Sequence, residues 1–72
     1  MKSIDLHGVK HSDVSKVLDS FFWEMIKKNV SYFQVITGNS EKMKNIVIEL
    51  CDEYGFEAEE DPSNGGSLTI FC

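Results

Sequence analysis

The chain has 72 residues, of which 42% are apolar and 26% are charged, and its formal net charge is −5 at pH 7. This composition is typical of a globular protein and excludes a disordered one. A chain of this length buries only about 60% of the surface that its unfolded form exposes, so it has room for one core. We therefore expect a single domain over residues 1–72.

Membrane and secreted classes are not indicated by the sequence. No apolar run approaches the roughly 20 residues that span a bilayer, and the first residues lead into a strand-like segment rather than a signal peptide. Cys51 and Cys72 lack metal-ligand spacing, which favours reduced cysteines that pack in the protein. We expect a cytoplasmic protein with no membrane partner.

The basic residues of the chain are seven lysines, with no arginine. Affinity for nucleic acid comes largely from Lys and Arg contacts to phosphates, and Arg supplies the bidentate contacts. The charge balance therefore argues against a protein that binds nucleic acid strongly.

The first half of the chain predicts a strand, a helix and a second strand. Residues 3–7 alternate in polarity, as a strand does, and residues 32–37 form a nearly continuous apolar strand, expected to be buried on both faces. Between them we expect a helix over residues 13–28, with Ser12 as N-cap and Asn29 at the left-handed end. The predicted apolar stripe of this helix comprises Val14, Val17, Leu18, Phe21 and Met25.

The second half predicts another helix and a hairpin. Ser40 is the expected N-cap of a helix that ends at Gly55. Residues 56–60 and 67–72 alternate like strands, and residues 61–66 are rich in turn formers. The elements predict an α+β two-layer sandwich of β-α-β-α-β-β order, with a mixed four-stranded sheet and both helices packed on it.

This arrangement predicts where a ligand would bind. The first two strands form a parallel βαβ unit with a right-handed crossover. If the third strand runs parallel to them, the loops after the first two strands and the hairpin turn share one edge of the sheet. Ligands of open α/β sheets bind outside the carboxyl ends of the strands, so this edge is the predicted functional edge.

Three motifs resemble those of one known family. Residues 4–9, Ile-Asp-Leu-His-Gly-Val, resemble the LDLHG signature that opens small MutS-related (Smr) domains, and residues 35–38, Val-Ile-Thr-Gly, resemble the family's strand-end I-[TH]-G-x-G element. Residues 64–70 are similar to its closing GG-x-G-x-x-x-V hairpin. The order and spacing match over essentially the whole chain. The chain thus resembles a stand-alone Smr domain.

The resemblance implies a fold and an activity. Smr domains are similar in fold to the C-terminal domain of bacterial translation initiation factor three. The family is associated with nucleic-acid nicking or RNA cleavage, and often accompanies MutS-type or RNA-binding repeat proteins. Many members carry a second glycine two positions after the first, with a His or Arg nearby, whereas this sequence reads Gly-Asn-Ser-Glu-Lys over residues 38–42.

His7 and Asp5 are the candidate catalytic residues at the predicted edge. Histidine titrates near neutral pH, so it can take a proton from a water or give one to a phosphodiester oxygen, and Asp5 would orient the imidazole. The alternative is a structural hydrogen-bonded pair that fixes the loop around Gly8. The residues leave both interpretations open.

The segment after the second strand is a candidate phosphate site. Backbone N–H groups at the start of a helix, together with nearby lysines, favour an anion, whereas the alternative is an ordinary serine-capped turn. The residues expected to contact nucleic acid are Gly8, Lys10, Thr37, Gly38, Asn39, Ser40, Lys42, Lys44, Gly65 and Gly66.

Acidic residues near the same edge act against this interpretation. Residues 57–61 carry a run of carboxylates that would repel a polyanion, although solvated surface charge is their usual role. Asp5 and Asp61 could hold Mg²⁺ with waters, because this ion often takes only one or two protein carboxylates. No spacing requires a metal, and no cofactor is assigned.

Trp23 is a candidate for a partner interface. At 100° per residue it points away from Val14, and Phe22 and Ile26 flank it. Tryptophan is enriched at interface hot spots, which favours docking of a protein or a second copy. The alternative is that the helix is rotated and Trp23 covers the rim of the core.

Two functions of different classes follow from these observations. The first is a nucleic-acid-binding domain for structured RNA or DNA with weak endonuclease activity. The second is a catalytically inactive protein interaction module of the same fold. The Asp-Leu-His-Gly motif of residues 5–8 favours the first, and the acidic balance and the altered segment 38–42 favour the second.

Overall fold

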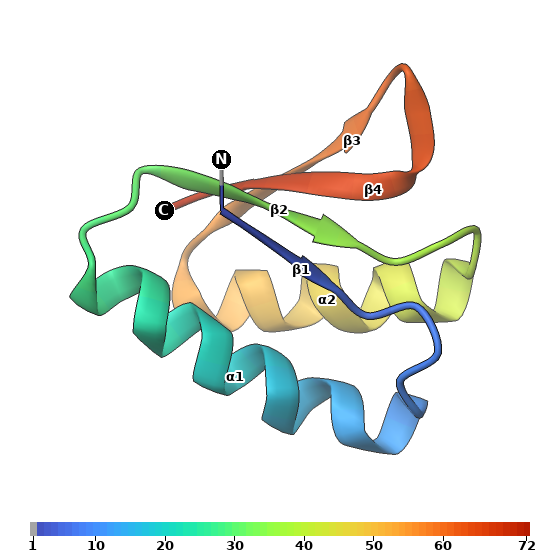
Figure 1. Cartoon of the computed structure of the whole chain (residues 1–72), viewed down its shortest axis with the longest axis horizontal. Helices are drawn as coiled ribbons and strands as arrows, with labels where there is room; N and C mark the ends of the chain where they lie inside the picture. The colour runs from blue at the N-terminus through green and yellow to red at the C-terminus, as the bar shows by residue number, and fades with distance from the viewer. Residues whose placement is uncertain (1) are drawn as a thin grey trace.

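The computed structural model describes residues 2–72, with the backbone alone for Asn64; Met1 of the expected domain lies outside the described residues. The elements confirm the predicted β-α-β-α-β-β order (Figure 1). They are β1 (Ser3–Asp5), α1 (His11–Lys27), β2 (Tyr32–Ile36), α2 (Glu41–Tyr54), β3 (Glu57–Asp61) and β4 (Asn64–Phe71).

The strands form one mixed four-stranded sheet of order β1-β2-β4-β3. Strand β1 is parallel to β2, and β4 is antiparallel to both β2 and β3, so β1, β2 and β3 run in the same direction. The loops after β1 and β2 and the β3–β4 turn therefore share one edge of the sheet, as predicted (Figure 1).

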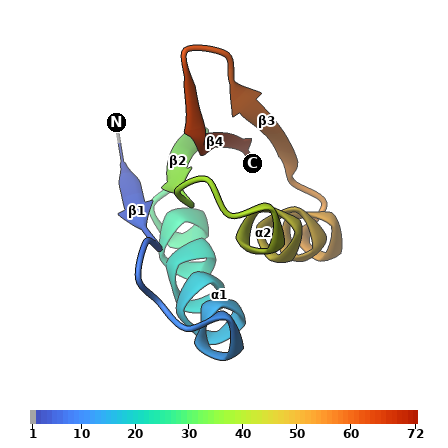
Figure 2. The same ribbon diagram turned by 90° about the vertical axis from the view of Figure 1, so that its right-hand side faces the viewer.

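Both helices lie side by side on one face of the sheet, which gives the predicted two layers (Figure 2). Strand β2 shows the consequence: Phe33 and Val35 are buried under the helices, whereas Tyr32 is exposed and Gln34 and Ile36 are half-buried. The expectation that this strand is buried on both faces is wrong, because no helix among the described residues covers the second face.

The core is built around Phe22 of α1. Its ring centroid lies 5.4 Å from that of Phe33, 5.1 Å from Tyr54 and 5.2 Å from Phe56, so one side chain joins α1 to the sheet and to α2. Close aromatic pairs of this kind stabilise a core by about 0.5–1.5 kcal/mol beyond the area that they bury. The other buried apolar residues are Leu6, Val14, Leu18, Met25, Val35, Met43, Val47, Cys51, Leu68 and Ile70.

Helix α1 is rotated relative to the predicted stripe. Its buried residues include Phe22, while Val17 is 38% exposed and Phe21 is half-buried. The rotation follows from packing against two elements, because α1 contacts α2 as well as the sheet. Phe22, expected on the exposed flank of Trp23, is in fact central to the core.

The helix ends confirm the predictions in part. Ser40 caps α2 by accepting a hydrogen bond from the Met43 N–H, and Gly55 ends it in the left-handed conformation with φ 76°. Asn29 also has a positive φ, of 55°, as predicted. Helix α1, however, begins at His11 with Lys10 as its N-cap and with no side-chain cap, so the predicted Ser12 cap is wrong.

The hairpin turn is shorter than predicted. The Asp61 carboxylate accepts hydrogen bonds from the Ser63 N–H at 3.0 Å and the Ser63 hydroxyl at 2.8 Å, which closes the turn at residues 62–63. Strand β4 therefore starts at Asn64, and Gly65 and Gly66 belong to this strand rather than to a loop. The pairing of β3 with β4 is irregular at this point.

Candidate functional site

The predicted edge brings His7 and Gly38 together. A Cβ atom built on Gly38 would lie 3.4 Å from His7 Cδ2, so the imidazole packs against the turn that follows β2. Gly38 has a φ of +69°, a left-handed conformation that side chains strain. The exposed histidine and the half-buried Gly38 therefore lie together at this edge, although they are distant in sequence.

Asp5 positions His7 through the main chain. Its Oδ1 accepts a hydrogen bond of 2.8 Å from the backbone N–H of His7. This contact fixes the loop that begins after β1, where Gly8 has a φ of +87°. The geometry corresponds to the structural alternative for the pair, because the Asp5 carboxylate accepts the main-chain N–H of His7.

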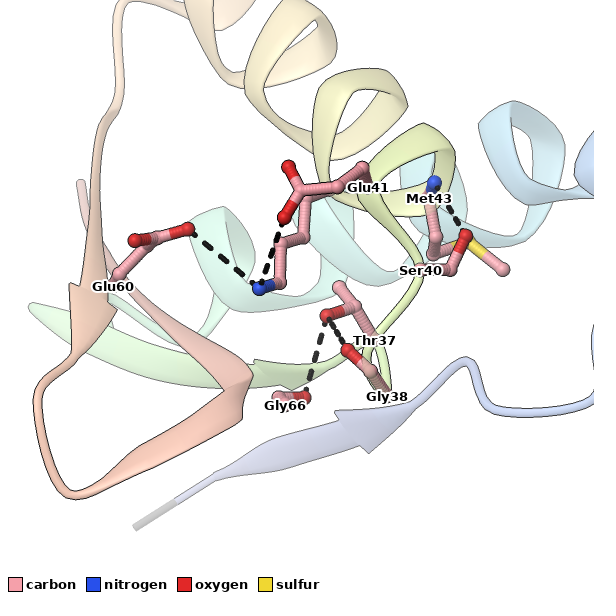
Figure 3. Close-up of polar contacts among 8 residues, drawn as sticks. Thr37, Gly38, Ser40, Glu41, Met43, Glu60 and Gly66 are labelled. Carbon is pink, nitrogen blue, oxygen red and sulfur yellow. Dashed lines mark hydrogen bonds and ion pairs between the residues drawn. The ribbon is translucent and has the colours of Figure 1, made fainter.

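The turn after β2 is held by strand β4. The carbonyl oxygen of Gly66 accepts the backbone N–H groups of Thr37 at 2.8 Å and Gly38 at 3.0 Å. The Thr37 hydroxyl contacts the carbonyl oxygens of Gly38 and Gly66 at 2.9 and 3.3 Å (Figure 3). Thr37 is buried, so its hydroxyl stabilises the turn from within.

The start of α2 completes the turn. The Ser40 hydroxyl is used as the helix cap, while Asn39 and Lys42 are exposed. The Asn39 amide oxygen would lie 4.0 Å from a Cβ built on Gly65, so the Asn39 side chain reaches toward β4. Lys42 and Lys10, which precedes α1, are the exposed candidate cations at this edge, and within the described part of the chain neither forms an ion pair.

Lys44 differs from the other lysines near this edge. Its side chain is only 10% exposed, and its ammonium lies 3.8 Å from Glu41 and 3.7 Å from Glu60 (Figure 3). A buried lysine is tolerated when carboxylates compensate its charge. These two ion pairs act against a contact of Lys44 with phosphate, which stays a prediction.

A magnesium ion between Asp5 and Asp61 is not supported by the topology. These residues lie on β1 and β3, which are opposite edges of the sheet with two strands between them. At about 4.8 Å per strand the separation is roughly 14 Å, too far for one ion to contact both carboxylates. Among the described residues, no group of three or more His, Cys, Asp or Glu side chains is placed to hold a metal.

The cysteines differ in environment. Cys51 is buried, and burial, with a smaller contribution from Cys72, raises the pKa of its thiol to about 12, consistent with a packing residue. Cys72 is exposed, so it does not pack as expected. Burial of part of its surface also raises the pKa of Cys72.

Two other surface features lie away from this edge. Trp23 is 54% exposed on α1, as predicted from the helical spacing. A cavity of about 470 Å³ lined by Lys2, Val30, Ser31 and Tyr32 lies at the start of β2, the opposite end of that strand from Gly38. No helix in the described part of the chain is both long and apolar enough to cross a bilayer.

Comparisons with known proteins identified no relative. No family model matches the chain, and neither the curated proteins nor the solved structures gave a significant match. The resemblance to Smr domains therefore stays a prediction.

Two features of the structure were not predicted from the sequence. One is the pairing of Lys44 with an acid, although the three-residue spacing from Glu41 is typical of a helical ion pair. The contact with Glu60 had no sequence signal, since it depends on how β3 lies against α2. The exposed side of Tyr32 was also missed, because a continuous apolar segment does not reveal which face a helix covers.

Proposed function

We propose that the edge formed by His7, Gly38, Lys10 and Lys42 binds the phosphates of structured RNA or DNA. The observation that carries the proposal is the contact of the His7 ring with the Gly38 turn. It places an exposed imidazole beside a rigid turn at the start of a helix, where backbone N–H groups and the helix dipole favour an anion. The LDLHG-like motif supports the same function.

The number of available cations predicts weak binding. With Lys44 neutralised, Lys10 and Lys42 are the lysines proposed to contact phosphate. Two contacts to a duplex give a salt slope of about −1.8, so the affinity should fall about twelvefold between 50 and 200 mM salt. The net charge of −5 acts in the same direction.

His7 is the candidate general acid or base for phosphodiester cleavage. In this proposal the imidazole takes a proton from an attacking water while the oxygen of that water bonds to phosphorus. The P–O bond to the leaving oxygen breaks, and that oxygen takes a proton from solvent. Asp5 is a positioning residue, because it holds the His7 main chain.

Binding is tested by NMR titration of the labelled chain with a short structured RNA and a branched DNA at low salt. We expect shifts at the amides of Gly8, Gly38 and Lys42, and a weaker response in Lys42→Ala. Lys27→Ala is the matched control, because Lys27 is exposed at the far end of α1. Unperturbed spectra, or equal losses in the two variants, would refute the proposal.

Cleavage is tested by comparing Asp5→Asn with Asp5→Ala in assays of RNA and DNA cleavage. Asparagine retains an oxygen that can accept the His7 N–H, so Asp5→Asn should keep most of the activity if the role is positional. Asp5→Ala should lose it, and His7→Ala should abolish it. If Asp5→Asn keeps its fold but loses activity as fully as Asp5→Ala does, the carboxylate charge acts on the imidazole instead.

The second candidate function is a protein interaction module. The exposed side chain of Trp23 favours it, because tryptophan is enriched at the hot spots of protein interfaces. An absence of nucleic-acid binding at low salt would favour this function.

A further inference from the structure

The uncovered face of the sheet has a distinct composition. Its central strands place Tyr32, Gln34 and Ile36 of β2 and Ser67, Thr69 and Phe71 of β4 on this side of the sheet, where they pair across the two strands; Ser67 itself is buried. The Tyr32 and Phe71 ring centroids lie 6.3 Å apart, and these side chains are 47% and 39% exposed. The Gln34 amide donates a hydrogen bond to the Ser67 hydroxyl at 3.1 Å. The centre of the face is therefore uncharged and partly aromatic.

Acidic residues border this uncharged centre on both sides. Asp5 of β1 pairs with Ile36, while Glu57 and Glu59 of β3 pair with Phe71 and Thr69, so all three carboxylates lie on the uncovered face. The four strands contain no lysine, arginine or histidine. Cations that pair with these carboxylates must therefore come from outside the sheet.

We infer that the uncovered face, defined by Asp5, Tyr32, Glu57, Glu59 and Phe71, docks an extended basic segment of a partner protein. Lysine and arginine side chains would pair with the carboxylates at the borders and lie over the two rings, where cations are attracted to the aromatic faces. Apolar side chains of the segment would cover the centre. An uncharged aromatic centre within a charged rim is the usual anatomy of a protein interface.

Charge decides between this occupant and two others. A nucleic acid would bring its phosphates against the carboxylates of both borders, which costs free energy. A second copy would place identical acidic borders against each other, because a two-fold interface pairs a surface with itself. A basic segment is the occupant whose charge complements the face.

The size of the face predicts a short segment bound weakly. Four strands at about 4.8 Å spacing and five residues at about 3.3 Å give a projected area of roughly 320 Å². Stable protein complexes bury about 800 Å² per partner. The interaction is therefore transient unless the partner also contacts another surface.

The test is an NMR titration of the full chain with a peptide that carries lysines at both ends and valines in its centre. A length of about eight residues lets the extended peptide cross the sheet. We expect shifts at the amides of Tyr32, Gln34, Thr69 and Phe71. A peptide with glutamate in place of lysine should leave these amides unchanged.

Variants separate charge from aromatic contact. The double variant Glu57→Gln/Glu59→Gln should weaken the peptide affinity about fivefold, and Tyr32→Ala by a similar factor. The matched control is Glu49→Gln/Glu53→Gln, which removes the same charge from exposed positions of α2. A loss in the control equal to that in the test variant would overturn the inference.

Two further outcomes of the titration would also overturn it. One is an unchanged spectrum at millimolar peptide, and the other is a stronger response of the same amides to oligouridine than to the basic peptide. The inference does not rest on the proposed nucleic-acid function. The readouts are separate, because that function is followed at Gly38 and Lys42.

Discussion

Removing the Tyr54 hydroxyl tests the contact between the two helices. Tyr54 of α2 donates a hydrogen bond to the carboxylate of Asp19 on α1. Tyr54→Phe keeps the ring packing against Phe22 and removes this bond. A hydrogen bond to a charged group contributes about 1.5–3 kcal/mol when buried, and because this pair is partly exposed we expect a loss of about 1 kcal/mol in the free energy of unfolding.

The effect should depend on pH. The hydrogen bond to Asp19, with smaller contributions from burial and nearby carboxylates, raises the pKa of Tyr54 from 10.0 to about 12. Because the folded pKa is the higher one, the stabilisation is fully present below pH 10 and is lost as pH rises toward 12. The difference between the wild-type chain and Tyr54→Phe should therefore shrink over this interval.

The assay is urea unfolding of both proteins at neutral pH and at several values above pH 10. In a separate thermal unfolding experiment at neutral pH, we expect the melting temperature of Tyr54→Phe to be lower by about 4–8 °C. The buried Cys51 titrates in the same alkaline interval, but it is present in both proteins, so its contribution cancels in the difference.

A double-mutant cycle with Asp19→Asn assigns the effect to the pair. We expect a coupling of about 1 kcal/mol at neutral pH. Tyr32→Phe is the matched control, because its hydroxyl is removed from an exposed ring and should change stability by less than about 0.5 kcal/mol. A coupling near zero, or a difference that does not change between neutral pH and pH 12, would refute the reasoning.

Three further substitutions test the turn, the buried lysine and the core. Gly38→Ala should lower stability by about 1 kcal/mol, because alanine is strained at this positive φ. Unchanged thermal melting would contradict this. Lys44→Met should leave RNA binding unchanged. It should alter stability by less than about 1 kcal/mol, because methionine retains the apolar stem of the side chain. A loss of RNA binding like that of Lys42→Ala would instead show that Lys44 contacts phosphate. Phe22→Ala should lower the free energy of unfolding by about 4 kcal/mol, and circular dichroism showing a fully native chain with wild-type melting would rule out its central place in the core.

The candidate site was predictable where the signal was local. The Asp5-Leu6-His7-Gly8 motif and the Gly38 turn follow strands whose carboxyl ends share an edge, so sequence order was enough to bring them together. The roles of individual side chains were less predictable. The contact of Asp5 with the His7 main chain and the neutralisation of Lys44 by Glu60 depend on distances of a few ångströms, which sequence spacing does not specify.

The sequence by itself determined the order of elements and most of their ends. Helical spacing, the Ser40 cap and Gly55 act through neighbouring residues, so their effect is encoded within a few positions of the chain. Only the tertiary structure decided which face of α1 packs on the core, so that Phe22 is buried and Phe21 only half-buried. It also decided which face of β2 remains uncovered. These choices depend on how the helices pack against each other and against the sheet, and packing is a property of residues that are distant in sequence.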